Sequence, residues 1–129
     1  MFFKISKAVI FLWGIWILSV GIYTMLKPEI IIQSYAIEPM NALGWSTLSG
    51  NISPLLILLG LSALLGIWLS NVTFLWVILL AEGIVLCGRA VAIYQHGYHD
   101  GLKVILIAEI AIALWLVIHL RMHQTKNQR

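Results

Sequence analysis

The sequence predicts an all-α, polytopic membrane protein, a bundle of four transmembrane helices with a short outer interfacial helix. Of its 129 residues, 61% are hydrophobic and only 10% are charged, and the mean hydropathy is +0.98. Four apolar stretches are each long enough to cross ~30 Å of hydrocarbon at ~1.5 Å per residue. No low-complexity tract or soluble domain interrupts them. We therefore expect residues 1–129 to form a single transmembrane domain.

The predicted spans cover about residues 8–26, 52–69, 72–94 and 102–120. The first span follows Lys4 and Lys7 and so resembles the start of a secretory signal peptide. However, it is as long as a full span, carries two tryptophans and has no clear small-residue cleavage site. We therefore expect a retained helix.

The connections between the last three spans are short. Little more than Ser70 and Asn71 separates the second span from the third, and the turn 95–101 separates the third from the fourth. Connections of this length force consecutive helices to lie side by side and antiparallel. Asn51 and Asn71 each begin a triplet that matches the N-glycosylation pattern, but both are more simply helix starts with Asn at or near the N-cap.

The one long connection, 27–50, is too apolar for an ordinary solvated loop. Pro28 suits the first position of a helix, Glu29 complements the helix dipole there, and Pro39 would end the helix. We therefore predict a short interfacial helix from about Pro28 to Ile37 on the outer face of the bundle. An extended segment pressed onto the bundle is the alternative that the sequence leaves open.

Lysine and arginine residues near the span ends predict the orientation, because cytoplasmic flanks carry more of them. The outer side would hold only Lys27 and Lys103. The side of the termini would hold Lys4, Lys7, Arg121, Lys126 and Arg129. We therefore expect both termini in the cytoplasm. Tyrosines at the outer span ends, and tryptophans near the Ser70-Asn71 turn, agree with this orientation because aromatic rings favour headgroup depth.

Three charged residues, Glu82, Arg89 and Glu109, lie well away from the ends of the predicted spans. A charge in hydrocarbon costs about 3 kcal/mol or more unless it faces a partner or water, so such residues mark an ion pair, a relay or a ligand pocket. Glu82, Arg89 and His96 follow one another at helical spacing, which places them on one helix face. Because Arg89 and Glu109 lie at similar depth on adjacent helices, we expect them to contact each other.

The three charged residues total −1 if both carboxylates are ionised. We expect one carboxylate to be protonated and favour Glu82, because it is the deeper of the two. Asn51, together with Ser53, could add neutral hydrogen bonds at a similar depth. The candidate ligand-binding residues are Glu82, Arg89, Glu109, Asn51 and His96. Three roles stay open for them: holding the helices in register, forming the floor of an outward-opening pocket, and pairing with another subunit.

Several classes of site are not predicted. No nucleophile is visibly paired with a base, no glycine-rich phosphate loop precedes a helix, and no zinc motif occurs. His96, His99 and Asp100 share one turn, which is weak evidence for a metal, and we predict none. Because His119 and His123 lie at the opposite end of the bundle from His96, we expect no bis-histidine haem and no other cofactor. The eight basic residues form no patch, so we expect no nucleic-acid partner.

Two functions are compatible with this pattern. The favoured one is a non-enzymatic module that binds an amphiphilic ligand or a partner membrane protein within the lipid bilayer, as a single chain or a homo-oligomer. The alternative is a small intramembrane enzyme that performs acid-base chemistry on a lipid-like or quinone-like substrate, with Glu82 and Glu109 as acid and base. The sequence leaves open whether the protein is an enzyme.

Glu82-Gly83, Gly88-Arg89, Asp100-Gly101 and Glu109 follow one another within residues 45–120. Over this range the chain resembles a family of small bacterial four-helix membrane proteins, a domain of unknown function that is DoxX-like in layout. The second helix of such proteins often opens with an arginine and a glycine pair, where this chain has Asn51, Ser53 and Pro54. The resemblance implies the four-helix fold and a location in the bacterial inner membrane. It implies no reaction.

Overall fold

The computed structural model describes residues 2–29, 32 and 42–127. Four of its helices are long and apolar enough to cross a membrane: Phe3–Leu26, Ala42–Trp68, Val72–His96 and Leu102–Thr125. The prediction of an all-α, four-helix membrane protein is therefore confirmed, and the chain is a multi-pass membrane protein. The interfacial helix predicted between Pro28 and Ile37 lies largely outside the described residues, as does the extended alternative.

The helical elements in chain order are α1 (Phe2–Leu26), α3 (Ala42–Thr47), the π-helical turn η1 (Leu48–Ile52), α4 (Ser53–Trp68), α5 (Val72–His96) and α6 (Leu102–Asn127). Because α3, η1 and α4 follow one another without a break, this helical stretch starts well before residue 52, where the sequence placed the second span. Pro54 lies in the first turn of α4, directly after the π-helical turn. The π-helical turn lets the chain arrive at that proline already helical.

The two asparagines at the predicted helix starts behave differently. Asn71 is the N-cap of α5, and its side chain accepts a hydrogen bond from the Thr73 N–H at 3.0 Å. Asn51 lies within η1, next to Ile52, which is the N-cap of α4 and makes no side-chain capping hydrogen bond. Since the helix continues upstream of Asn51, backbone carbonyls can satisfy the N–H groups that a capping side chain would otherwise bond.

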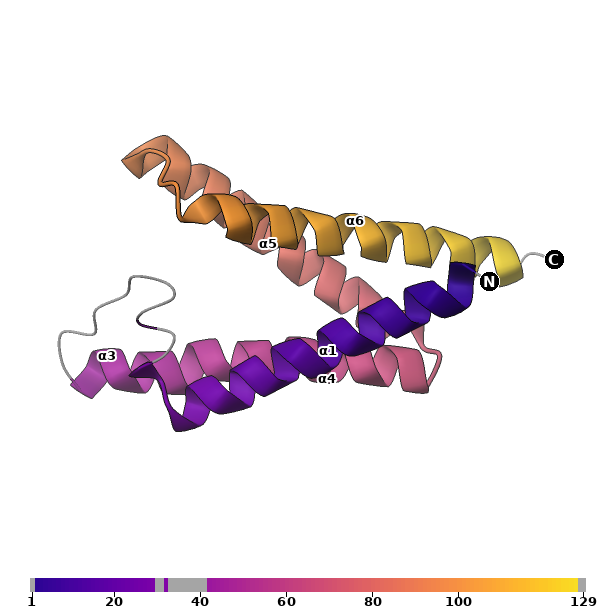
Figure 1. The fold of residues 1–129 in the computed structure, drawn as a ribbon, viewed down its shortest axis with the longest axis horizontal. Helices are drawn as coiled ribbons and strands as arrows, with labels where there is room; N and C mark the ends of the chain where they lie inside the picture. The colour runs from indigo at the N-terminus through magenta and orange to yellow at the C-terminus, as the bar shows by residue number, and fades with distance from the viewer. Residues whose placement is uncertain (1, 30–31, 33–41, 128–129) are drawn as a thin grey trace.

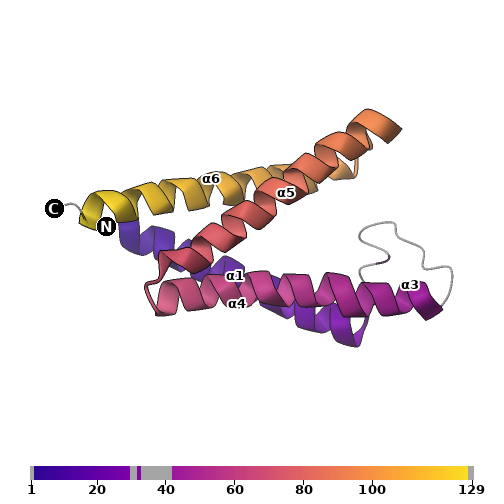
Figure 2. The same cartoon turned by 180° about the vertical axis from the view of Figure 1, so that it is seen from behind.

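The four long helices form two pairs that diverge like the arms of a V (Figure 1). α1 packs beside α4, and α5 lies beside α6. Both termini and the α4–α5 turn lie at the apex, here called the terminus end. The α5–α6 turn and α3 lie at the opposite end, here called the loop end, where the two pairs are far apart. Figure 2 shows the same divergence from behind.

Glycines let α1 and α4 approach each other closely. A Cβ added to Gly60 would lie 2.6 Å from the backbone nitrogen of Leu18, and one added to Gly21 would lie 2.7 Å from that of Ile57. No side chain fits at such distances. Because lipid tails are as apolar as leucine, close van der Waals packing of this kind is a main attraction between helices in a membrane. The α1–α4 pair is therefore the tightest contact in the bundle.

The core of the bundle lies toward the terminus end and takes residues from all four long helices: Ile10, Ala63, Leu75, Ile78, Ile112, Leu116 and Leu120. Nearby, Ser6 on α1 and His119 on α6 are both buried and share a hydrogen bond of 2.8 Å. Phe3 stacks on the His119 ring, with 4.9 Å between ring centroids. These contacts hold the first and last helices together at the apex of the V.

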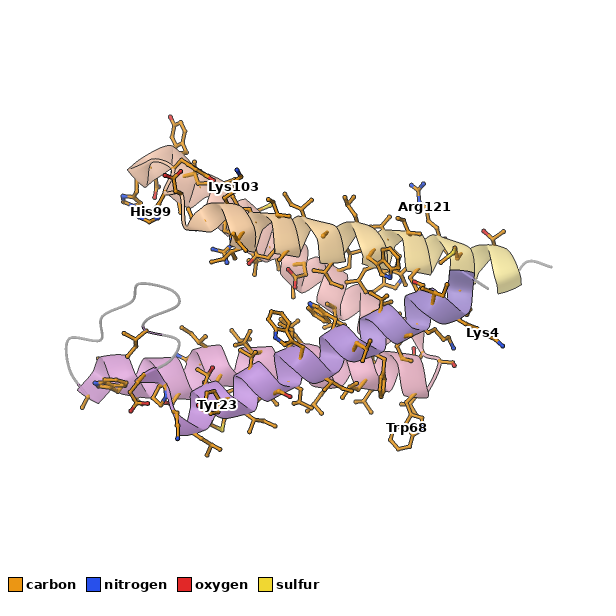
Figure 3. All side chains as sticks on the ribbon, in the orientation of Figure 1. Lys4, Tyr23, Trp68, His99, Lys103 and Arg121 are labelled. Carbon is orange, nitrogen blue, oxygen red and sulfur yellow. The ribbon has the colours of Figure 1, made fainter. Side chains whose placement is uncertain are left out.

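Apolar side chains also cover much of the outside of the bundle. Leu80 and Ile84 on α5, for example, are 65% and 73% exposed. Facing lipid, such side chains need no protein partner, which fits a membrane-spanning bundle. Figure 3 shows Lys4, Arg121 and Trp68 toward the terminus end and Tyr23, His99 and Lys103 toward the loop end. These six charged and aromatic side chains lie toward the ends of the helices, at the levels where headgroups would lie.

Candidate functional site

Arg89 on α5 and Glu109 on α6 form a two-pronged ion pair. Arg89 Nε donates to Glu109 Oε2, and Arg89 Nη2 donates to Glu109 Oε1, both at 2.6 Å. The two side chains are 20% and 17% exposed, so the protein buries most of the surface of both. Two parallel hydrogen bonds between charged groups suit the planar guanidinium fork of arginine. The contact predicted from the sequence is confirmed.

The short α5–α6 turn brings these two charges to the same depth. Arg89 lies two helical turns before His96 at the end of α5, and Glu109 lies two turns after Leu102 at the start of α6. Gly97 ends α5 with a φ of 85°, a left-handed conformation that glycine adopts without strain. The chain can therefore reverse at once, and α6 returns with Glu109 opposite Arg89.

Glu82 lies deeper, two turns from Arg89 toward the middle of α5. Its side chain is buried, with 7% exposed, and no residue in the described part of the chain donates a hydrogen bond to it. Its oxygens are not among the fully buried side-chain atoms of the described residues that lack a hydrogen bond, so the carboxyl group reaches the surface of the cleft. Glu82 lines the same cleft as Arg89 and Glu109 and can accept a hydrogen bond from a polar ligand there.

The cleft lies between the arms of the V and has a volume of about 400 Å³. Pockets for small molecules commonly measure ~300–1,000 Å³ and have mostly apolar walls with a few polar groups. This cleft fits that description, since Glu82, Arg89 and Glu109 are its only charged lining residues in the described part of the chain. Its apolar walls are formed by Trp13, Trp16, Ile17, Ile52, Leu56, Leu59, Val85, Val104, Ile105, Ala108 and Ile112.

Exposure of the lining residues shows which side of the cleft is open. Val104 and Trp16 are 75% and 59% exposed, whereas Ile112 and Glu82 are buried. Ile112 also belongs to the core of the bundle. A molecule that enters from the surrounding lipid would therefore meet apolar walls first and Glu82 near the closed end.

Neither a known protein family, nor a curated protein, nor a solved structure matches this chain. What the cleft can do is therefore argued from its own side chains. It combines one ion pair with a further carboxyl group among apolar walls, and its formal charge is −1 when both carboxylates are ionised. Such a site can accept hydrogen bonds from a polar head and cover an apolar chain. Among the described residues, no three His, Cys, Asp or Glu side chains group together as metal ligands would.

The structure does not bring the other two candidate residues, Asn51 and His96, to the cleft. Asn51 is exposed in η1, and its neighbour Ile52 lines the wall instead. His96 is exposed at the end of α5, two turns beyond Arg89. Helical spacing predicted that His96 shares a face of α5 with Glu82, but the cleft does not extend as far as the α5–α6 turn.

Sequence analysis missed Trp13 and Trp16, which line the cleft from α1. The two are three residues apart and so share a helix face, which is the one signal that could have paired them. Nothing in the sequence says that this face turns toward Glu82, because α1 is joined to the other helices through a long connection. The buried hydrogen bond between Ser6 and His119 was missed for the same reason.

Proposed function

We propose that this membrane protein binds an amphiphile in the cleft, with the polar head at Glu82 and the Arg89–Glu109 pair and the apolar tail between the helix pairs. The observation that carries this proposal is an apolar cleft of about 400 Å³ that contains a buried carboxyl group without a hydrogen bond from any described residue. A purely structural ion pair would need neither the third charged residue nor the open volume beside it.

An acid-base enzyme is the second candidate function, and one observation favours it. The two carboxyl groups of the cleft have different surroundings, since Glu109 is held by Arg89 while Glu82 accepts no hydrogen bond from a described residue. Carboxyl groups in different environments can serve as an acid and a base on one substrate. The binding proposal comes first because it requires only the cleft, whereas catalysis also requires a reacting group placed between the two carboxyls.

We further propose that the protein resides in a bacterial inner membrane with both termini in the cytoplasm. Both termini lie at one end of the bundle, as an even number of spans requires. Lys4 and Arg121 lie toward that end, and cytoplasmic flanks are rich in such residues. In this orientation the loop end and the wide part of the V face the outer leaflet.

The binding proposal is tested by filling the cleft. In Ala108→Trp an indole replaces a lining methyl group, while Leu114→Trp is the control on α6, because Leu114 is 59% exposed and does not line the cleft. Each variant is purified in a nonionic detergent, checked for a cooperative thermal transition, and examined by native mass spectrometry for retained lipid. We expect Ala108→Trp to retain at least about tenfold less amphiphile than Leu114→Trp, equivalent to ~1.4 kcal/mol of binding.

Equal retention by the two folded variants would contradict the proposal, because lipid would then bind only to the outer surface. A stoichiometric protein partner without lipid would favour the alternative that the cleft receives another membrane protein.

A further inference from the structure

The charges of the cleft restrict the head group that it can accept. Both hydrogen-bonded prongs of Arg89 point to Glu109, so the single cation lining the cleft in the described part of the chain already faces a carboxylate. Glu82 remains as a carboxyl group that no described residue bonds. An anionic head would have to compete with Glu109 for the guanidinium and would lie near the Glu82 carboxyl. A cationic head would meet neither obstacle.

The aromatic walls favour the same charge. Trp13 and Trp16 line the cleft that contains Glu82, and tryptophan has the most favourable ring face for a cation. A cation within ~6 Å of such a ring is attracted by the ring face, most strongly in sites that exclude water. Indole rings together with a carboxyl group form a typical setting for an ammonium group, because the rings contact its alkyl surface while the carboxylate neutralises its charge.

We infer that the ligand of the cleft is a lipophilic ammonium cation, whose charged nitrogen lies beside Glu82 between the ring faces of α1 and the Arg89–Glu109 pair and whose tail follows the apolar walls. The inference rests on the proposed function, since it names the class of amphiphile that the same cleft binds. The inference gives the two carboxyl groups different roles. Glu109 holds Arg89 in place, and Glu82 contacts the head group.

The test compares four probes with the same tail and different heads: dodecyltrimethylammonium, dodecylammonium, dodecanol and dodecanoate. Binding of each radiolabelled probe is measured by equilibrium dialysis against the full-length protein in nanodiscs of uncharged lipid. Binding to Ala108→Trp, whose cleft is filled, is subtracted to remove partition into the bilayer. Glu82→Gln keeps the shape of the side chain and removes the negative charge that Glu82 takes on beside an ammonium group. Asp100→Asn in the exposed α5–α6 turn is the matched control for loss of one acidic group.

We expect both ammonium probes to bind more tightly than dodecanol, and dodecanoate to bind most weakly. Glu82→Gln should weaken ammonium binding by at least about tenfold, or ~1.4 kcal/mol, and should leave dodecanol binding nearly unchanged, which also shows that the variant is folded. Asp100→Asn should bind all four probes as the unmodified protein does.

The outcomes separate this inference from the proposed function. If dodecanol binds to the cleft as tightly as the ammonium probes, or if Glu82→Gln does not reduce the ammonium preference, the head-group assignment is wrong while the binding function stands. Preferred binding of dodecanoate would also overturn it, because Arg89 would then be the head-group ligand. If no probe shows binding that depends on an open cleft, both proposals fail together.

Discussion

Arg89 and Glu109 show how two charged residues persist inside an apolar helix pair. Each of the two hydrogen bonds between them is 2.6 Å long, and the fork of the guanidinium matches the two oxygens of the carboxylate. Lysine cannot replace this geometry, since its ammonium is a single point charge on a flexible stem. The pair therefore fixes the orientation of the Glu109 side chain as well as neutralising it.

Removing either partner should be costly. We expect Arg89→Ala and Glu109→Ala each to lower the stability of the detergent-solubilised protein by roughly 3–5 kcal/mol, because each leaves the other charge unpaired. The double variant should be much less damaged than the sum of the two. Thermal unfolding of the unmodified protein, the two single variants and the double variant in a nonionic detergent measures the coupling energy between the two side chains. Arg121→Ala, at an exposed position on α6, is the control. Simple additivity would show that the two side chains do not interact.

The contact between Arg89 and Glu109 could be predicted from the sequence, but the full set of residues that line the cleft could not. Arg89 and Glu109 flank one short turn, so helix geometry alone fixes their relative depth. Glu82 follows on the same face of α5. By contrast, Trp13 and Trp16 belong to a helix whose rotation depends on how α1 packs against α4, which no local pattern records.

At the level of helices, some parts of the bundle are closely packed, and others leave the space that forms the cleft. α1 and α4 stay in contact along the line of Gly14, Gly21 and Gly60. α5 packs on α4 near their shared turn, where a Cβ added to Gly66 would lie 2.8 Å from a Leu75 methyl carbon. Farther from that turn the two pairs separate, and the cleft occupies the space between them. The position of small residues thus decides where the bundle is tight.

A methyl group at Gly60 should disturb the α1–α4 contact, because it would collide with backbone atoms of Leu18 and Gly14 that cannot move independently. We expect Gly60→Ala to lower stability by about 1–3 kcal/mol, the usual range for overpacking. Gly83→Ala on α5 is the matched control, because nothing lies within 4 Å of a Cβ added there. Thermal unfolding in the same detergent compares them. A Gly60→Ala protein as stable as Gly83→Ala would mean that α1 and α4 are not in contact here.

The sequence predicted the helices better than their ends. The four apolar stretches predicted the number of spans, and the short connections between the last three predicted which helices lie antiparallel and side by side. The start of the second helical stretch was misplaced because Asn51 resembles an N-cap residue, while the π-helical turn η1 carries the helix through it. Hydrogen-bond patterns of this kind depend on neighbouring packing and leave little trace in residue type.

At the level of the whole molecule, the bundle has two unlike ends. The terminus end is closed by the core and by the buried Ser6–His119 hydrogen bond, and Lys7 Nζ donates to Ser70 Oγ across it at 3.3 Å. The cleft opens away from this closed end, from the buried Ile112 toward the exposed Val104. A ligand would therefore enter from the side of the membrane that the loop end faces, so the orientation of the protein decides which leaflet supplies it.

Orientation is tested by single cysteines in a Cys87→Ser background, so that each introduced cysteine is the one thiol of the chain. We expect Asp100→Cys, in the α5–α6 turn, to react with a membrane-impermeant maleimide in intact cells. Thr125→Cys, near the end of α6, should react only after permeabilisation, because its side of the bundle is predicted to be cytoplasmic. The reverse labelling pattern would place the cleft at the inner leaflet and overturn the predicted topology.

The central claim is that the cleft between the helix pairs is a binding site for an amphiphile whose head lies at Glu82. The most direct measurement is an experimental structure of the protein in lipid nanodiscs, at a resolution that shows side chains. We predict elongated density between α1 and α5 that follows the apolar walls and ends within hydrogen-bond distance of the Glu82 carboxyl. A cleft closed by the helices themselves, with Glu82 bonded to protein side chains and no such density, would contradict the account.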